Sequence, residues 1–223
     1  PRPTRPIFGP LLLLFLFFAV ISAMQQVRIV AIGDSTTAGT PGYASPLEAP
    51  PLGRGDPTSQ YGYWLMRSHP DWEVLNRGVN GERSDQIRDR FDGDVISARP
   101  TVVVVVAGVN DVYQGRGVDE VTKQLRWMYD RAQGAGIRVV AGTILPYDTA
   151  TPEQNKRMRG INAWIRQQAD ADPALGFADT RAAVGAPGRP DMLSESPDHL
   201  HPSPSGYRAM AGALRPVIEQ ILR

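Results

Sequence analysis

Five short apolar runs alternate along the chain with longer stretches in which apolar residues recur at helical spacing. The short runs are rich in β-branched residues and are predicted to be strands; they cover 27–32, 73–75, 101–107, 137–143 and 177–179. The third run contains five consecutive valines. A run that is apolar on both faces is typical of a strand at the centre of a parallel sheet.

The stretches between these runs are predicted to be amphipathic helices, because their apolar residues follow the 3.6-residue period. Thr151, Pro152 and Gln154 form a capping-box pattern with proline at the first helical position. Ser203 and Pro204 predict a similar start for the last helix. The buried faces are expected to be formed by Val118, Val121, Leu125, Met128 and Ala132, by Met158, Ile161, Trp164 and Ile165, and by Tyr207, Met210, Ala211, Leu214, Val217, Ile218 and Ile221. Alternating strands and helices predict a three-layer α/β/α domain whose ligands bind at the carboxyl ends of the strands.

Composition narrows the classes of function. The chain has 223 residues, of which 42% are hydrophobic and 21% charged, enough apolar material for one domain with a core. Its 24 basic and 23 acidic residues give a net charge of +1, so no nucleic-acid partner is expected. The absence of cysteine excludes disulfides, thiolate metal sites and a cysteine nucleophile.

Residues 1–24 are expected to be a signal peptide or N-terminal anchor, and residues 25–223 a single domain. Arg2 and Arg5 precede an apolar run at 11–23 that ends in small residues, which is the order found in secretory signals. The run is short for a membrane-spanning helix, which needs about 20 apolar residues.

Two other interpretations of the leader stay open. If the apolar run extends back to Ile7 and is retained, residues 7–24 form an anchor and are the only part expected to contact a membrane. Met24 stands just before the first predicted strand. If the leader is a signal or an anchor, the protein is expected to be secreted, periplasmic or membrane-anchored. If translation starts at Met24 instead, the protein is expected to be cytoplasmic.

Polar groups suited to acyl transfer follow the predicted strands. Ser35 comes directly after the first strand, and a serine hydroxyl is a poor nucleophile unless a base takes its proton. His201 is the candidate base, and Asp198, three residues earlier, can hold the imidazole tautomer and orientation. The backbone amides of Ser35 and Gly81 and the side-chain amide of Asn110 are candidate donors to a developing oxyanion.

These groups lie in four sequence blocks. The blocks are Gly33-Asp34-Ser35, Asn76 to Gly81, Gly108-Val109-Asn110-Asp111 and Asp198-x-x-His201-Pro202. In this order they resemble the four blocks of the SGNH (GDSL) hydrolases, and the resemblance covers essentially Val27 to the C-terminus. It implies a flavodoxin-like three-layer fold with a parallel five-stranded sheet, and esterase or lipase-type acyl hydrolysis with no metal or other cofactor.

The resemblance also implies a role for each matching position. It makes Ser35 the nucleophile, His201 the base and Asp198 its partner, with an oxyanion hole at Ser35, Gly81 and Asn110. Val109 is a departure, since the family more often has a small or polar residue there, and it concerns the packing of that loop. Asp34 and Asp111 are expected to hold their loops by hydrogen bonds to backbone amides.

The expected substrate is a small-molecule, lipid or sugar acyl ester. Residues 39–60 are rich in Pro, Gly and Ser, show no periodicity and leave the carboxyl end of the first strand, so they are expected to border the site. Tyr43, Leu47 and Tyr147 are predicted to bind substrate by lining an acyl pocket. No long amphipathic lid is visible in the sequence, which favours short-chain acyl esters, acetylated sugars or lysophospholipids over triglycerides.

Other functions stay open. An acyltransferase would share the acyl-enzyme and replace water by a sugar hydroxyl. The hydroxyl-rich segment 35–40 is similar to the phosphate loop of flavodoxins, which suggests a mononucleotide-binding module but leaves Asn110 and His201 without a task. His199 and His201 beside Asp198 could bind a metal, although no third ligand cluster is present. A catalytically inactive carbohydrate-binding relative is disfavoured because every catalytic position is filled.

Overall fold

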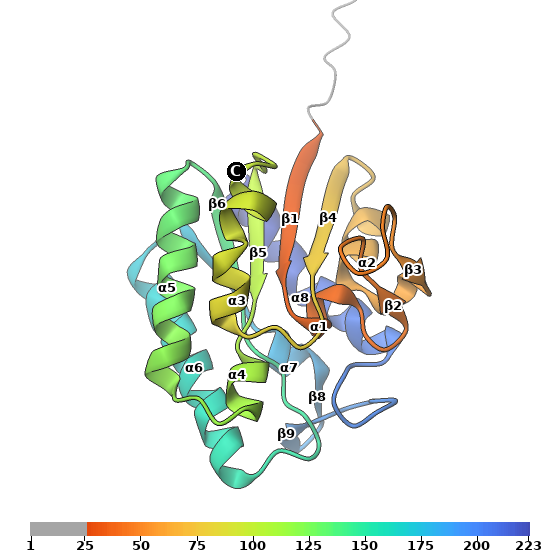
Figure 1. Ribbon diagram of the computed structural model, residues 1–223, viewed down its shortest axis with the longest axis vertical. Coiled ribbons are helices and arrows are strands. Elements are labelled where there is room, and N and C mark those ends of the chain that lie inside the picture. The colour runs from red at the N-terminus through yellow and green to blue at the C-terminus, as the bar shows by residue number, and fades with distance from the viewer. Residues whose placement is uncertain (1–25) are drawn as a thin grey trace, which may run out of the picture.

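The computed structural model describes residues 26–223. At its centre lies a five-stranded sheet in the order β4-β1-β5-β6-β7, in which all neighbours pair in parallel (Figure 1). The strands are β1 (Val27–Gly33), β4 (Trp72–Gly78), β5 (Val102–Val106), β6 (Arg138–Gly142) and β7 (Leu175–Ala178). The predicted parallel α/β fold is confirmed, and the five strands end at one edge of the sheet.

Helices cover both faces of the sheet. One face carries α3 (Ser84–Asp89), the π-helical turn η2 (Asp92–Ile96), α5 (Val118–Gly134) and α6 (Pro152–Ala171). The other face carries α2 (Tyr61–Ser68), α7 (Thr180–Val184) and α8 (Pro204–Ile221). Figure 1 shows α3 and α5 in front of the sheet and α8 behind it. Two short helices, α1 (Ser35–Ala38) and α4 (Val109–Tyr113), follow β1 and β5 directly.

The alternation of side chains along the strands divides the core in two. In β1, Val30 and Ile32 pack under α3 and α5, whereas Ile29 and Ala31 pack under α2 and α8. All five valines of β5 are buried, as expected of a central strand covered on both faces. This packing fixes the sheet and therefore the positions at which its strands end.

The predicted helix caps form. Thr151 Oγ1 accepts the amide of Gln154, and Gln154 Oε1 accepts the amide of Thr151. Ser203 Oγ accepts the amide of Gly206 at the start of α8, with Pro204 at its first position. The second cap fixes the chain directly after His201.

Short elements outside the main sheet were not predicted from the sequence. Within residues 39–60 the chain forms a small antiparallel ribbon, β2 (Tyr43–Ala44) with β3 (Arg54–Gly55), followed by the 3₁₀ turn η1 (Pro57–Ser59). A second ribbon pairs β8 (Gly185–Ala186) with β9 (Arg189–Leu193). Such ribbons are too short to produce a detectable alternation of apolar residues.

The predicted leader lies outside the described residues. Across residues 26–223, no helix is at once long and apolar enough to cross a bilayer.

Candidate active site

The first part of the site is the turn between β1 and α1. Asp34 caps α1, because its Oδ1 accepts the amide of Thr36 at 2.9 Å. Ser35 is the first residue of the helix, so its own amide has no acceptor within the helix. The Ser35 residue is only 7% exposed. The turn therefore presents one hydroxyl and one unpaired amide at the carboxyl edge of the sheet.

The loop before α8 brings His201 to this hydroxyl. His201 Nε2 lies 2.9 Å from Ser35 Oγ, and His201 Nδ1 lies 2.7 Å from Asp198 Oδ2. Both ring nitrogens of His201 are thus engaged, one by a carboxylate and one by a hydroxyl. In this geometry an imidazole can accept the hydroxyl proton through Nε2 while the carboxylate holds the proton on Nδ1.

The second oxygen of Asp198 holds the loop itself. Asp198 Oδ1 accepts the backbone amides of His201 at 2.8 Å and Leu200 at 3.0 Å. Partial burial raises the pKa of Asp198, but the hydrogen bonds from the His201 side chain and from the two amides outweigh it, so the pKa lies below its ordinary value. The carboxylate stays ionised and can stabilise a positive charge on the imidazole.

The other side of Ser35 is formed by the turns that follow β4 and β5. Gly81 has a φ of +75°, and a Cβ there would meet no atom within 4 Å, so backbone conformation and not crowding is the reason for glycine. Asn110 Nδ2 donates to the carbonyl of Glu82 at 2.9 Å. One amide hydrogen of Asn110 is used in this bond, and the second is available to a ligand.

Asp111 connects these two turns through hydrogen bonds. Its carboxylate accepts the Ser84 amide and the Ser84 hydroxyl, both at 2.8 Å. Asp111 is 1% exposed, and burial raises its pKa. Asp34 and Asp111 therefore both bond backbone amides, in agreement with the expectation from the sequence.

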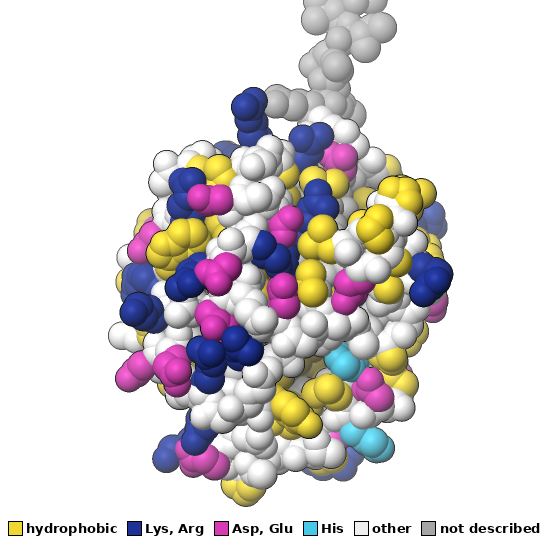
Figure 2. Space-filling view, in the orientation of Figure 1, with side chains coloured by type: hydrophobic (Ala, Val, Ile, Leu, Met, Phe, Trp, Pro, Cys, Tyr) yellow, Lys and Arg dark blue, Asp and Glu magenta, His cyan; other side chains and the backbone are white. Residues whose placement is uncertain are grey.

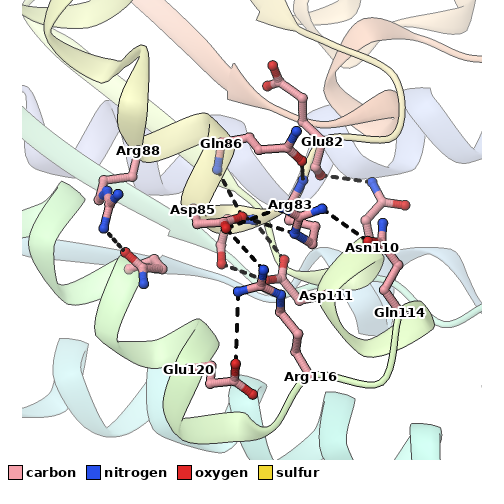
Figure 3. A network of polar contacts seen from close by, with 12 residues as sticks. Glu82, Arg83, Asp85, Gln86, Arg88, Asn110, Asp111, Gln114, Arg116 and Glu120 are labelled. Atoms are coloured by element: carbon pink, nitrogen blue, oxygen red, sulfur yellow. Dashed lines mark hydrogen bonds and ion pairs between the residues drawn. The ribbon is translucent and has the colours of Figure 1, made fainter.

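A charged network continues from this junction to the surface (Figure 3). The Asp85 carboxylate accepts Arg83 at 3.1 and 3.2 Å and Arg116 at 3.1 Å, and Arg83 also donates to Gln114 at 3.1 Å. The network connects the turn that contains Gly81 to the helix that carries Asn110. Both candidate donors therefore sit on one cross-linked unit.

The segment 39–60 packs against the same turn. Ser45 is fully buried and donates to the Gly78 carbonyl at 2.6 Å, and the Glu48 carboxylate accepts the Asn80 amide at 2.8 Å. Gly78 is required because a Cβ there would lie 2.0 Å from the Ala38 amide. The segment therefore supports the chain just before Gly81.

The three residues predicted to line an acyl pocket lie in different surroundings in the structure. Tyr43 lines a cavity of about 310 Å³ along the edge strand β4, whose lining includes neither Ser35 nor His201. Leu47 is half-buried in the same segment. Substrate binding by Tyr43 and Leu47 stays a prediction. Tyr147 is 1% exposed and packs with the core, and its role in substrate binding also stays a prediction.

Two exposed residues near the site were not singled out as ligand contacts from the sequence. Tyr113 is 60% exposed on the helix of Asn110, and His199 is exposed in the loop of His201. A lone tyrosine at the end of a short helix gives no sequence signal. His199 stood out in the sequence as a possible metal ligand. No group of three or more ligating side chains able to hold a metal ion is found among residues 26–223.

Burial of Asp34 gives a prediction for stability. Burial raises the pKa of Asp34 from 3.8 to about 7. Between these values the folded state binds more protons than the unfolded state, so stability falls as the pH rises. Asp34→Asn keeps an oxygen for the Thr36 amide and removes this titration. We expect its free energy of unfolding, relative to the parent, to increase by a few kcal/mol (about 1.4 per pKa unit) between pH 4 and pH 7.5 in urea unfolding.

Asp85→Asn is a matched control for which the opposite pH dependence of stability is expected. Hydrogen bonds from Arg83 and the charge of Arg116 outweigh partial burial and lower the pKa of Asp85. Asp85→Asn should therefore lose stability relative to the parent as the pH rises toward the ordinary carboxyl value, and the difference should stay constant above it, up to pH 7.5. A flat difference for Asp34→Asn across this range would contradict the prediction.

The fold and the grouping of these blocks at one sheet edge define an SGNH-type acylhydrolase. The GDSL-like lipase/acylhydrolase family matches residues 31–209, and the chain belongs to this family. It is 28% identical over 156 residues to the acetylxylan esterase of Geobacillus stearothermophilus, a match that covers 63% of this chain and 69% of the relative.

Solved structures show the same fold. The structure of the Geobacillus stearothermophilus acetylxylan esterase has a TM-score of 0.68 at 22% identity and covers 86% of this chain and 94% of its own. A GDSL-like lipase from Bacteroides thetaiotaomicron has a TM-score of 0.65 at 24% identity, with 87% and 89% covered. A protein of the G-D-S-L family from Desulfitobacterium hafniense has a TM-score of 0.69 at 23% identity, with 86% and 99% covered.

Proposed function

We propose that the protein is a serine esterase that hydrolyses short-chain carboxylic esters through an acyl-enzyme on Ser35. The observation that carries the proposal is the continuous hydrogen-bonded chain from Asp198 through His201 to the Ser35 hydroxyl, with distances of 2.7 and 2.9 Å. Membership of the acylhydrolase family supports the same reaction class.

The reaction has two steps. In the first, Ser35 Oγ attacks the ester carbonyl while His201 Nε2 takes the hydroxyl proton, and the tetrahedral intermediate collapses as His201 returns that proton to the leaving alcohol. In the second, water attacks the acyl-enzyme, His201 takes a proton from the water and gives it to Ser35 Oγ, and the carboxylic acid leaves. Asp198 stays ionised throughout and stabilises the imidazolium.

The oxyanion is held by the amides of Ser35 and Gly81 and by Asn110 Nδ2. The bond from Asn110 to the Glu82 carbonyl fixes the orientation of the side-chain amide before substrate binds. Such preorganised donors stabilise charge that develops only in the transition state.

The preference for a short acyl group rests on two observations. The sequence shows no long amphipathic segment that could act as a lid over a long acyl chain. The 28%-identical relative is an acetylxylan esterase, which suggests an acetyl ester as the first substrate to test.

Covalent labelling tests the proposal without knowledge of the natural substrate. The parent protein is incubated with a fluorophosphonate ester, and its intact mass is compared with that of Ser35→Ala. We expect one adduct on the parent and none on the variant. No adduct on a folded parent, or an unchanged adduct on Ser35→Ala, would refute the serine-esterase mechanism.

Asn110 offers a test of the oxyanion hole. Asn110→Asp has nearly the same shape but cannot donate from the side chain when ionised, so we expect kcat on 4-nitrophenyl acetate to fall by about 10²–10³. Lys123→Ala, exposed on α5 and away from this network, is the control and should change kcat by less than about threefold. If Asn110→Asp is folded and falls no further than Lys123→Ala, Asn110 is not an oxyanion donor.

A further inference from the structure

The loop that carries His201 contains a residue in an unusual backbone conformation. His199 has a φ of +65°, in the left-handed region where glycine is favoured. Its side chain is nevertheless 74% exposed and contributes nothing to the core. A large side chain at such a position, between Asp198 and His201, needs a reason other than packing.

The imidazole of His199 is held in place from one side. Its Nδ1 lies 3.3 Å from Asp148 Oδ2, and the side chain of Asp148 is only 15% exposed. The Asp148 carboxylate is itself fixed by the Leu193 amide at 2.9 Å, and the Asp148 amide donates to the His199 carbonyl at 2.9 Å. Since Nδ1 faces the carboxylate, Nε2 is the atom that His199 presents to solvent.

A second exposed side chain, Tyr113 at the end of α4, packs against the residue that precedes Asp148. Tyr113 is 60% exposed, and its ring lies edge-on to Tyr147 with centroids 5.9 Å apart. Tyr147 directly precedes Asp148, so Tyr113 and His199 are supported by neighbouring residues of the connection between β6 and α6. Figure 2 shows histidine and hydrophobic side chains around a hollow on the face drawn there.

The chemistry of the first step brings the leaving alcohol to His201, in the loop that also carries His199. His201 Nε2 must reach the oxygen of the leaving alcohol to protonate it. The candidate oxyanion donors Gly81 and Asn110 belong to other turns of the sheet edge, and Tyr113 lies on the helix that carries Asn110. His199 lies two positions from His201 in the same loop.

We propose that His199 and Tyr113 form a subsite for the alcohol part of the ester, and that this alcohol is a sugar. The proposal rests on the esterase function proposed above. A sugar offers hydroxyl groups to the exposed imidazole nitrogen and C–H groups to an aromatic ring, whereas a simple alkyl alcohol would use only the ring. His199 is thus a specificity residue, with Asp148 fixing its orientation.

Two esters with the same acyl group separate this subsite from the reaction centre. One is 4-nitrophenyl acetate, and the other is methyl xyloside that carries a single acetyl ester. We expect His199→Asn to lower the ratio of kcat/KM for the sugar ester to that for 4-nitrophenyl acetate by about threefold to tenfold, the effect of one hydrogen bond. Asparagine tolerates the left-handed conformation, so the loop keeps its course.

Tyr113→Leu should lower the same ratio, mainly through a higher KM for the sugar ester. Trp127→Leu is the matched control, because Trp127 is 41% exposed on α5 and belongs to neither group of site residues. His199→Gly tests the loop directly. If the residue matters only for the backbone, glycine raises the Tm and leaves the ratio unchanged.

The outcomes are distinguishable. A ratio that stays unchanged in both His199→Asn and Tyr113→Leu, in proteins that hydrolyse both esters, overturns the sugar subsite alone. A parent that hydrolyses neither ester and takes no fluorophosphonate overturns the esterase function together with the subsite. A lower ratio in both variants, with Trp127→Leu unchanged, supports the proposal.

Discussion

Ser35→Ala and His201→Ala are each expected to lower kcat on 4-nitrophenyl acetate by about 10⁴–10⁶, and the double variant to be no slower than the single ones. The reason is that the two groups act as one unit, since the hydroxyl is a useful nucleophile only while Nε2, 2.9 Å away, accepts its proton. Once either the Ser35 hydroxyl or the His201 imidazole is absent, the remaining group no longer contributes to the formation of the acyl-enzyme. The residual rate comes from the oxyanion donors and from binding.

Steady-state kinetics of the three variants, with the Tm of each, checks this prediction. Ser35 and His201 are 7% exposed each, so the Tm shows whether a loss of rate comes from unfolding. Effects of the single variants that multiply in the double variant would mean that Ser35 and His201 act independently. That outcome would contradict a nucleophile and base pair.

Much of the fold could be predicted because the relevant patterns are long. The five-valine strand and the two capped helices each repeat one signal over several residues, and the structure contains them within a few residues of the predicted bounds. The contact between Ser35 and His201 also agrees with the expectation from the sequence. Parallel strands end at a common edge, and each block follows a strand or precedes the last helix.

Other features depend on contacts that no local pattern reveals. The ribbons β2–β3 and β8–β9 are too short for periodicity. The burial of Tyr147, which is 1% exposed and lies edge-on to Tyr113, follows from the course of the connection after β6. Exposure of Tyr113 and the left-handed conformation of His199 are properties of tertiary structure.

The second large effect is expected for Asp198→Asn, which should lower kcat by about 10³–10⁴ while leaving the loop folded. Asparagine keeps an oxygen for the amides of Leu200 and His201, which Asp198 Oδ1 accepts at 3.0 and 2.8 Å. Its NH₂ group would then face His201 Nδ1. That nitrogen would have to act as an acceptor, so the proton would move to Nε2, where it blocks transfer from Ser35.

Asp148→Asn is the matched control, because it changes the other aspartate–histidine pair of the same rim. It should cost at least about a hundredfold less in kcat on 4-nitrophenyl acetate, since one hydrogen bond at the rim is worth roughly tenfold or less. Asp198→Ala separates the two tasks of Asp198: it loses the bonds to the Leu200 and His201 amides as well and should have a lower Tm than Asp198→Asn. If Asp198→Asn keeps more than a tenth of the parent kcat, the carboxylate is not needed to set the tautomer, and the Ser35–His201 pair would work without it.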